Sequence, residues 1–257
     1  MQPPPATAGE PAQPAPQPQA AYRLRLAQCA ADLHAVQALR FEVFNLELDE
    51  GLTQSYDTGL DADAFDAQCE HLMVQDRDGL VVGTYRLQTG NRAGQALGYY
   101  SAREFDFSPF EAQRRQILEL GRACIHQQHR SFAVLNLLWK GIAACARDRG
   151  ARYLIGCSSL TSQDPAVGAA AWRLLAAHRA PPAWWTLPHP AFACPLGELA
   201  ATPPRIPRLL SAYLALGAAV CGPPAIDREF RTIDFLTWLD IESPALQAMH
   251  LRGRFVG

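Results

Sequence analysis

The chain has 257 residues, of which 49% are hydrophobic and 19% charged, which is typical of a folded globular protein. Its formal net charge of -2 at pH 7 excludes proteins that bind nucleic acid through bulk positive charge. Its seven cysteines form neither a Cys-x-x-Cys pair nor a zinc-like spacing. We therefore expect reduced thiols, a cytoplasmic location and no metal site.

Residues 1–20 are dominated by proline and glutamine and have neither the basic nor the apolar region of a signal peptide. We expect a disordered tail there, followed by a single folded domain over residues 21–257. No uncharged apolar run reaches the roughly 18 residues that a membrane-spanning helix needs. The longest run, residues 209–221, favours a packed core helix over a helix on a membrane surface. Any contact with the inner membrane would then be peripheral.

The first half of the domain contains a strong hairpin signal, because two apolar runs flank Asp78-Gly79. Helical spacing of apolar residues precedes it, with Asp32 as a possible cap. The predicted elements up to residue 98 are an edge strand (22–29), a helix (32–48), an acidic loop (51–67), the hairpin strands (71–76 and 80–87) and a loop (90–98).

The second half alternates buried strands with helices. The predicted elements are a strand (117–126), a helix (131–148) that Gly150 ends, a strand (153–158), two helices (164–178 and 208–216) and one or two strands between residues 220 and 239. A hairpin requires antiparallel pairing, whereas strand–helix–strand favours a parallel crossover. The chain is therefore predicted to be an α/β (α+β) protein with a mixed central sheet and helices on both faces.

One predicted strand raises a chemical question. In ILELGRACI (residues 117–125), Glu119 and Arg122 interrupt an apolar run. A charge that is buried without a partner destabilises a protein by several kcal/mol. Regular alternation would also place the two side chains on opposite faces of the sheet. A β-bulge near Gly121 would bring both to one face. We therefore expect either a cleft or an ion-pair network at this strand.

The order of elements resembles the GNAT acyltransferase fold, and the motifs resemble the N-acyltransferases of ornithine-lipid synthesis with their hemolysin-like relatives. The resemblance covers roughly residues 22–240 and rests on LRFEVFNLE (39–47), DAFDAQCEHLMVQD (63–76), VVGTYRLQTG (81–90), YYSAREFDFS (99–108), LELGRACIHQQHR (118–130), LLWKGI (137–142), IGCSSL (155–160) and the stretch 207–236. Acyl-homoserine-lactone synthases are a similar sister branch, but the tryptophan that they carry after Phe44 is missing here.

The resemblance implies transfer of a (3-hydroxy) fatty acyl group from acyl carrier protein to the α-amine of ornithine, giving lyso-ornithine lipid. The donor would be a phosphopantetheine thioester, acyl-ACP, with no tightly bound cofactor. Two alternatives stay open. The chain could be an acyl-homoserine-lactone synthase or another N-acyl amino-acid synthase, or it could be a non-catalytic GNAT-like binding domain.

The catalytic candidates implied by the resemblance are Glu119, Arg122, Cys157 and Ser158. Glu119 would accept the amine proton or bind the ammonium, Arg122 would pair with an aspartate or the substrate carboxylate, and Cys157 or Ser158 would protonate the leaving thiolate. A small buried cysteine is the other reading of Cys157. The substrate-binding candidates are Arg40, Phe44, Asp63, Asp66, Arg86 and His126, although a structural ion-pair network could also account for these charges.

The donor phosphate is expected at the start of the helix after this strand, where free backbone N–H groups bind anions. The residues concerned are Gln128, Arg130, Ser131, Phe132 and Ala133. Ser131 replaces a glycine of the GNAT loop, which suits the single phosphate of an acyl carrier protein better than coenzyme A, and it could also simply cap the helix. A basic patch for the acidic carrier protein is predicted from Arg103, Arg114, Arg115, Arg130 and Lys140.

Overall fold

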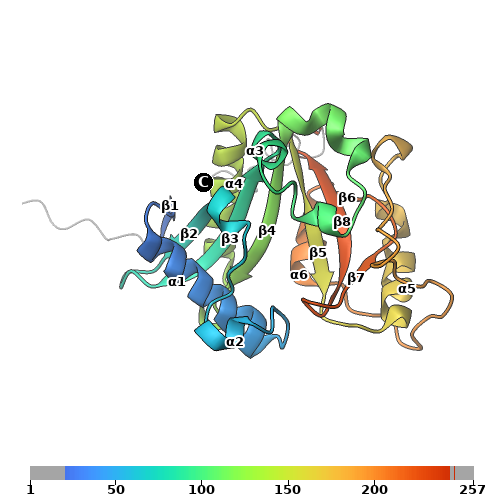
Figure 1. Cartoon of the computed structure of the whole chain (residues 1–257), viewed down its shortest axis with the longest axis horizontal. Coiled ribbons are helices and arrows are strands. Elements are labelled where there is room, and N and C mark those ends of the chain that lie inside the picture. The colour runs from blue at the N-terminus through green and yellow to red at the C-terminus, as the bar shows by residue number, and fades with distance from the viewer. Residues whose placement is uncertain (1–20, 244–245, 247–257) are drawn as a thin grey trace, which may run out of the picture.

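The computed structural model describes residues 21–243 and residue 246. The tail predicted over residues 1–20 lies outside these residues. The described chain forms one sheet in the order β1-β2-β3-β4-β5-β8-β6, with β7 also paired to β8 (Figure 1). The strands are β1 (Arg23–Leu26), β2 (Glu70–Gln75), β3 (Val81–Thr89), β4 (Ile117–Ile125), β5 (Tyr153–Leu160), β6 (Ala219–Val220), β7 (Ala225–Asp227) and β8 (Thr232–Asp240).

Six α-helices accompany the sheet in the described residues. They are α1 (Ala30–Phe41), α2 (Ser55–Thr58), α3 (Gly90–Gln95), α4 (Phe132–Asp148), α5 (Pro165–Leu174) and α6 (Arg208–Ala215). Helix α1 continues into a π-helical turn, Glu42–Glu47, and 3-10 turns are formed by Ser101–Arg103, Ser108–Gln116 and Gln127–His129.

The predicted hairpin is confirmed by the antiparallel pair β2 and β3. Asp76 closes its turn by accepting the backbone N–H groups of Asp78 and Leu80 at 3.0 and 2.9 Å, while Gly79 takes the left-handed φ of 84° that glycine adopts without strain. Strand β4 then pairs antiparallel with β3 and parallel with β5. The parallel crossover through α4 is therefore also confirmed.

The strand period of two distributes the core over both faces of the sheet. Leu72 packs in one cluster with Leu138 of α4, whereas its neighbour Met73 packs in another with Val36 and Leu39 of α1. Helices α4 and α1 thus cover opposite faces, as Figure 1 shows. The predicted mixed sheet with helices on both faces is confirmed.

Three local predictions are wrong. Asp32 does not cap α1, because its carboxylate is held by Arg25 at 2.6 Å and Cys29 occupies the cap position. The loop predicted over residues 90–98 contains the short helix α3, which the side chain of Thr89 caps by accepting the N–H of Arg92. The C-terminal part contains three strands rather than one or two, because β6 and β7 pair with different ends of β8.

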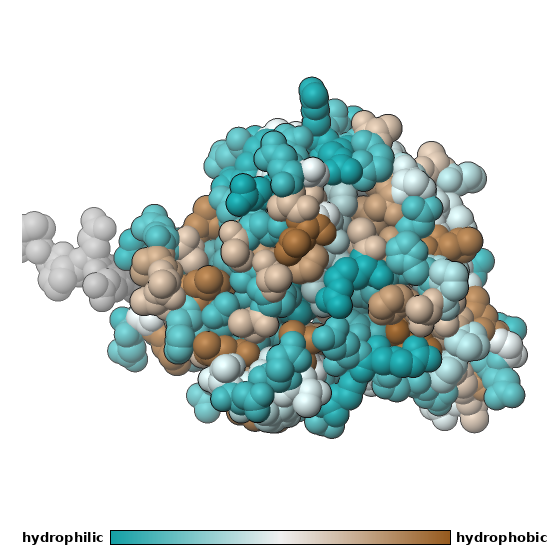
Figure 2. All heavy atoms as spheres, in the orientation of Figure 1, coloured by the Kyte–Doolittle hydropathy of each residue, from teal (hydrophilic) through white to brown (hydrophobic). Residues whose placement is uncertain are grey.

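The longest apolar run, residues 209–221, is packed into the core as α6 and β6, with Leu210 and Val220 almost fully buried. Within residues 21–243, none of the helices combines the length and apolarity that crossing a membrane requires. Figure 2 shows polar and apolar residues mixed over the visible face, with hydrophilic residues prominent at its upper end.

Candidate active site

Strands β4 and β5 pair only at their beginnings. Their register joins Ile117 to Tyr153, Leu118 to Leu154 and Glu119 to Ile155. Gly156 follows the last of these pairs and allows a close approach of the two strands, since a Cβ at this position would lie 2.2 Å from the carbonyl oxygen of Leu120. Beyond this point the strands part, and a cavity of about 310 Å³ opens between them.

A β-bulge shapes the β4 side of this cavity. Thr84 pairs with Cys124 and Arg86 with Gly121, so β4 carries one residue more than β3 between these pairs. The extra residue is accommodated at Arg122, whose φ of 48° lies in the left-handed region. Glu119 and Arg122 consequently both line the cavity. A bulge near Gly121 is confirmed, but it begins after Gly121 rather than between Glu119 and Arg122, and Arg122 takes the unusual conformation.

Beside the cavity lies an ion-pair cluster that we call the Arg–Asp network. Its members are Arg40, Arg86, Arg122, Asp61, Asp63 and Asp66. Arg40 holds Asp66 at 2.7 Å, Arg86 holds Asp63 at 2.7 Å and Arg122 holds Asp63 at 3.0 Å. Burial opposes the Asp66 carboxylate, but the hydrogen bonds and charge of Arg40 outweigh it and hold the pKa of Asp66 well below its ordinary value.

The network separates the predicted substrate-binding residues into two groups. Arg40 and Asp66 are buried in the network and do not line the cavity. Their positions therefore fit a structural ion pair rather than a substrate-binding role. Arg86 and Phe44 do line it. Arg86 also keeps its Nη2 without a hydrogen-bond partner. Asp61, which belongs to the network, was missed because its loop offered several equivalent aspartates.

Glu119 is bound by backbone groups rather than by an arginine. Its two carboxylate oxygens accept the N–H groups of Tyr100 and Ser101 at 2.9 and 2.8 Å. Burial raises the pKa of Glu119, while these backbone hydrogen bonds act in the opposite direction. Glu119 therefore fixes the start of the 3-10 turn Ser101–Arg103 against β4.

Tyr100 is a central residue that sequence reasoning missed. Its ring lies 4.8 Å from the guanidinium carbon of Arg86 and 4.7 Å from that of Arg122, within cation–π range. Arg103 approaches from a third side at 5.5 Å. Burial raises the pKa of Tyr100. The available signal was the motif YYSAREFDFS, in which no single tyrosine stood out.

The remaining catalytic candidates lie in the cavity, whereas His126 does not. Cys157 and Ser158 line it from β5, and burial raises the pKa of Cys157 well above its ordinary value, so its thiol is protonated. His126 instead contacts Glu42 at 3.0 Å and accepts the N–H of Gln128. The structure thus places this predicted substrate-binding residue outside the cavity lining.

Acidic residues also line the cavity. The motif PPAIDREFRTIDF, with Asp227 and Asp234, suggested either a part of the acceptor or acyl pocket or turn and bulge chemistry, and both of these residues line the cavity. Glu50 and Asp234 line the cavity, and burial raises their pKa values to about 7 and about 6. Glu104 lies beside Asp234. Sequence spacing indicated no metal ligands, yet in the described residues one group, Glu104, Cys157 and Asp234, has donor atoms all within 4.8 Å of one another.

The predicted phosphate-binding residues lie at the start of α4, directly after β4. Ser131 caps the helix by accepting the N–H of Val134, so the capping role is confirmed. Arg130 forms a bidentate pair with Glu47 at 2.5 and 2.7 Å. Gln128, Phe132 and Ala133 are exposed. The helix start thus lies at the end of β4 where the two cavity strands have parted.

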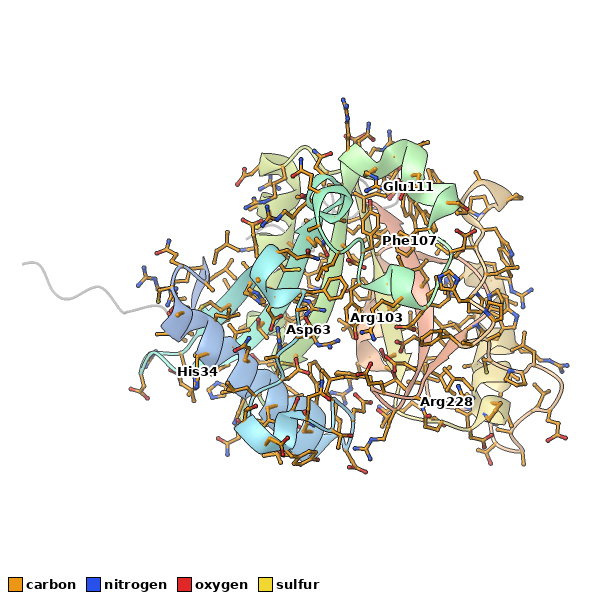
Figure 3. The ribbon with its side chains drawn as sticks, viewed as in Figure 1. His34, Asp63, Arg103, Phe107, Glu111 and Arg228 are labelled. Atoms are coloured by element: carbon orange, nitrogen blue, oxygen red, sulfur yellow. The ribbon has the colours of Figure 1, made fainter. Side chains whose placement is uncertain are left out.

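The predicted basic patch is not one surface. Arg114 and Arg115 precede β4, whereas Arg130 follows it, and a strand of this length spans about 30 Å. Figure 3 shows Glu111, the partner of Arg114, at the upper end of the molecule and Arg103 near its middle. Of these residues, Arg130 lies at the phosphate end, directly before α4, and Lys140 lies near the middle of α4.

The comparisons with known proteins agree with this architecture. The family model of the acetyltransferase (GNAT) domain matches residues 39–140. The L-ornithine N(alpha)-acyltransferase of Brucella abortus (strain 2308) is 35% identical over 241 residues, covering 85% of this chain and 84% of that relative.

Two solved structures share the fold at low identity. FeeM, an N-acyl amino acid synthase from uncultured soil microbes, has a TM-score of 0.55 at 10% identity, covering 91% of this chain and 97% of its own. The AHL synthase LasI has a TM-score of 0.52 at 13% identity, with coverages of 89% and 94%.

A parallel strand pair that opens after three residues, combined with the GNAT match, defines this chain as an acyltransferase with the GNAT fold. The identity to the Brucella protein extends over most of both chains, so the chain belongs to the L-ornithine N(alpha)-acyltransferase family. This is the family that the sequence motifs indicated.

Proposed function

We propose that the protein transfers a 3-hydroxy fatty acyl group from acyl carrier protein to the α-amine of ornithine, forming lyso-ornithine lipid. The observation that carries this proposal is the cavity between β4 and β5, which opens beside the start of α4. The name of the Brucella relative supports ornithine as the acceptor. Acyl carrier protein as the donor is supported by Ser131, which caps α4 where a glycine-rich phosphate loop would otherwise lie.

The donor would enter along the parted strand edges. Its phosphate would meet the free N–H groups at the start of α4, near Arg130. The pantetheine arm would pair with the edge of β4 that β5 has left. The bulge at Arg122 then turns backbone N–H groups out of the ladder, where one of them would polarise the thioester carbonyl.

The acceptor would bind on the β3 side of the cavity. The free Nη2 of Arg86 suits the carboxylate of an amino acid, because a guanidinium and a carboxylate form short charge-assisted hydrogen bonds. Arg122 pairs with Asp61 and Asp63 and would hold the bulge and Tyr100 in place. Glu119 would position Tyr100 and Ser101 rather than move the proton itself.

The reaction requires a neutral amine and a protonated leaving group. The amine nitrogen attacks the thioester carbon, the C–N bond forms, and the C–S bond breaks. The amine proton leaves through water or an acidic group of the cavity, and the departing thiolate takes a proton. Cys157, whose thiol burial keeps protonated, and Ser158 are the donors on β5.

Expression in a bacterial host that lacks aminolipids, followed by lipid mass spectrometry, tests the proposal. We expect an ornithine acylated on its α-nitrogen with a 3-hydroxy fatty acid. Appearance of an acyl-homoserine lactone, or of an acylated amino acid other than ornithine, would replace this proposal by the alternative synthase function.

A further inference from the structure

Two carboxyl groups beside the cavity, Glu104 and Asp234, each keep one oxygen without a hydrogen-bond partner, although the two carboxyls interact with each other and Asp234 also bonds to Ser159. Glu104 and Asp234 are 2% and 5% exposed, and Oε2 of Glu104 and Oδ1 of Asp234 have no hydrogen-bond partner. Donor atoms of the two residues lie within 4.8 Å of each other. Buried polar atoms are almost always satisfied in native proteins. Two adjacent unsatisfied carboxyl oxygens therefore point to a missing cationic ligand.

The nearby cations of the chain are engaged elsewhere. Arg103 pairs with Glu229 at 3.1 Å, and Arg231 pairs with Asp49 at 2.9 Å. All four of these side chains are substantially exposed. Burial and the charge of Asp234 raise the pKa of Glu104, and the charge of Arg103 offsets only part of this effect.

The other acids of this region already have donors. Asp227 accepts the backbone N–H groups of Glu229 and Phe230, both at 2.8 Å, and Glu50 accepts the hydroxyl of Thr161. Both bonds of Asp227 end on Oδ1 and that of Glu50 ends on Oε1, and both residues line the cavity, so they add negative potential beside Glu104 and Asp234. Of these four acids, only Glu104 and Asp234 have a fully buried oxygen without a hydrogen-bond partner.

Asp234 lines the same cavity as Arg86. Arg86 lines the cavity from β3 and Asp234 from β8, and each has a buried side-chain atom without a hydrogen-bond partner, Nη2 of Arg86 and Oδ1 of Asp234. A ligand that satisfies both carries a carboxylate at one end and a compact cation at the other. An amino acid with a side-chain ammonium has this distribution of charge, and its ammonium supplies three donors.

We propose that Asp234, backed by Glu104, binds the side-chain ammonium of the acceptor and so selects a diamino acid over an amino acid with a neutral side chain. This inference rests on the proposed N-acyltransferase function. In this arrangement, residues on β8 and on the segment before β4 recognise the side chain of the acceptor. The attacking α-amine would bind nearer the bulge.

The test compares L-ornithine with L-norvaline, which has the same carbon chain without the terminal amine. In the wild-type protein we expect ornithine to bind more tightly by calorimetry. In Asp234→Asn the preference for ornithine over norvaline, measured as the ratio of kcat/KM, should fall about tenfold or more, since a buried charged partner is lost. Glu229→Gln is the matched control, because it removes one nearby exposed negative charge and should keep the ratio unchanged.

A proportional loss for both amino acids in Asp234→Asn, or equal binding of both to the wild type, overturns the inference. Glu104→Gln should reproduce the selective loss, and thermal unfolding of each variant shows that it is folded. Stoichiometric metal in the purified protein that Asp234→Asn removes would also overturn it, in favour of a metal site.

The calorimetric binding measurement needs no acyl donor, so it tests the ammonium site independently of the proposed acyl transfer. If ornithine binds selectively but no acyl transfer occurs, the proposed function fails and the ammonium site stands. If acyl transfer to ornithine occurs without discrimination against norvaline, the site fails and the function stands.

Discussion

A carboxylate inside a strand needs donors, and Glu119 obtains them from the backbone of a distant segment. The N–H groups of Tyr100 and Ser101 occupy both oxygens, so the charge is satisfied without an arginine. Arg122 pairs instead with Asp61 and Asp63. Glu119 and Arg122, which look like an ion pair in the sequence, thus bind different partners on the same wall of the cavity.

Glu119→Gln should destabilise the protein by about 1–3 kcal/mol, because a glutamine has one acceptor oxygen and leaves one buried N–H without a partner. Urea unfolding measures this change. Turnover should fall with it, since Tyr100 and Ser101 lose their support. Glu111→Gln, an exposed acid paired with Arg114, should change the free energy of unfolding by less than about 0.5 kcal/mol. Unchanged stability together with near-normal turnover in Glu119→Gln would contradict both roles.

The sequence could predict the site residues whose type is unusual for their surroundings in the chain. Glu119 and Arg122 stood out because charges interrupt an apolar strand, and both line the cavity. Asp234 belonged to a motif for which a pocket role and a turn role were both open, whereas Glu104 did not stand out, because acids next to aromatic residues are common on surfaces. Only the fold brings these two together from positions 130 residues apart, counted from their sequence numbers.

At the scale of elements, the site depends on where β4 and β5 stop pairing. Gly156 allows the backbone of β5 to approach Leu120 closely, and the bulge at Arg122 then bends β4 away. The hairpin and the crossover were predictable because turn residues and periodicity specify them locally. The third C-terminal strand was not, because the two-residue β6 is too short to show a period.

Gly156→Ala should force the two strands apart, because its Cβ would meet the backbone oxygen of Leu120 at 2.2 Å. We expect a loss of about 1–3 kcal/mol in the free energy of unfolding, as for other overpacked sites. Gly121→Ala is the matched control on the neighbouring strand, since its Cβ meets nothing within 4 Å. Equal stability of the two variants in chemical unfolding would show that the close approach is unimportant.

At the scale of the whole molecule, basic residues lie at both ends of β4. Arg114 and Arg115 precede its start, and Arg130 follows its end, where the donor phosphate is proposed to bind, while Lys140 lies farther along α4. Composition and net charge could not distinguish these ends, because they carry no information on position. If acyl carrier protein is the donor, as proposed, we expect it to dock at the end where α4 begins.

Charge reversal at Arg130 and Lys140 together should raise the KM for acyl carrier protein about tenfold or more, because rim charges steer association. Raised ionic strength should raise the KM of the wild type in the same direction. Charge reversal at Arg114 and Arg115 alters net charge equally and should leave KM unchanged. A similar KM in both double variants would mean that docking uses another surface.

The short pairing of β4 with β5 also has a mechanical consequence. β5 and β8 are joined by eight residue pairs, whereas β4 and β5 are joined by three. We therefore expect the sheet to twist more readily at residues 117–119 and 153–155 than within the longer ladders on either side. Such a twist would widen the cavity between β4 and β5 while the hydrogen-bond ladders on each side stay intact.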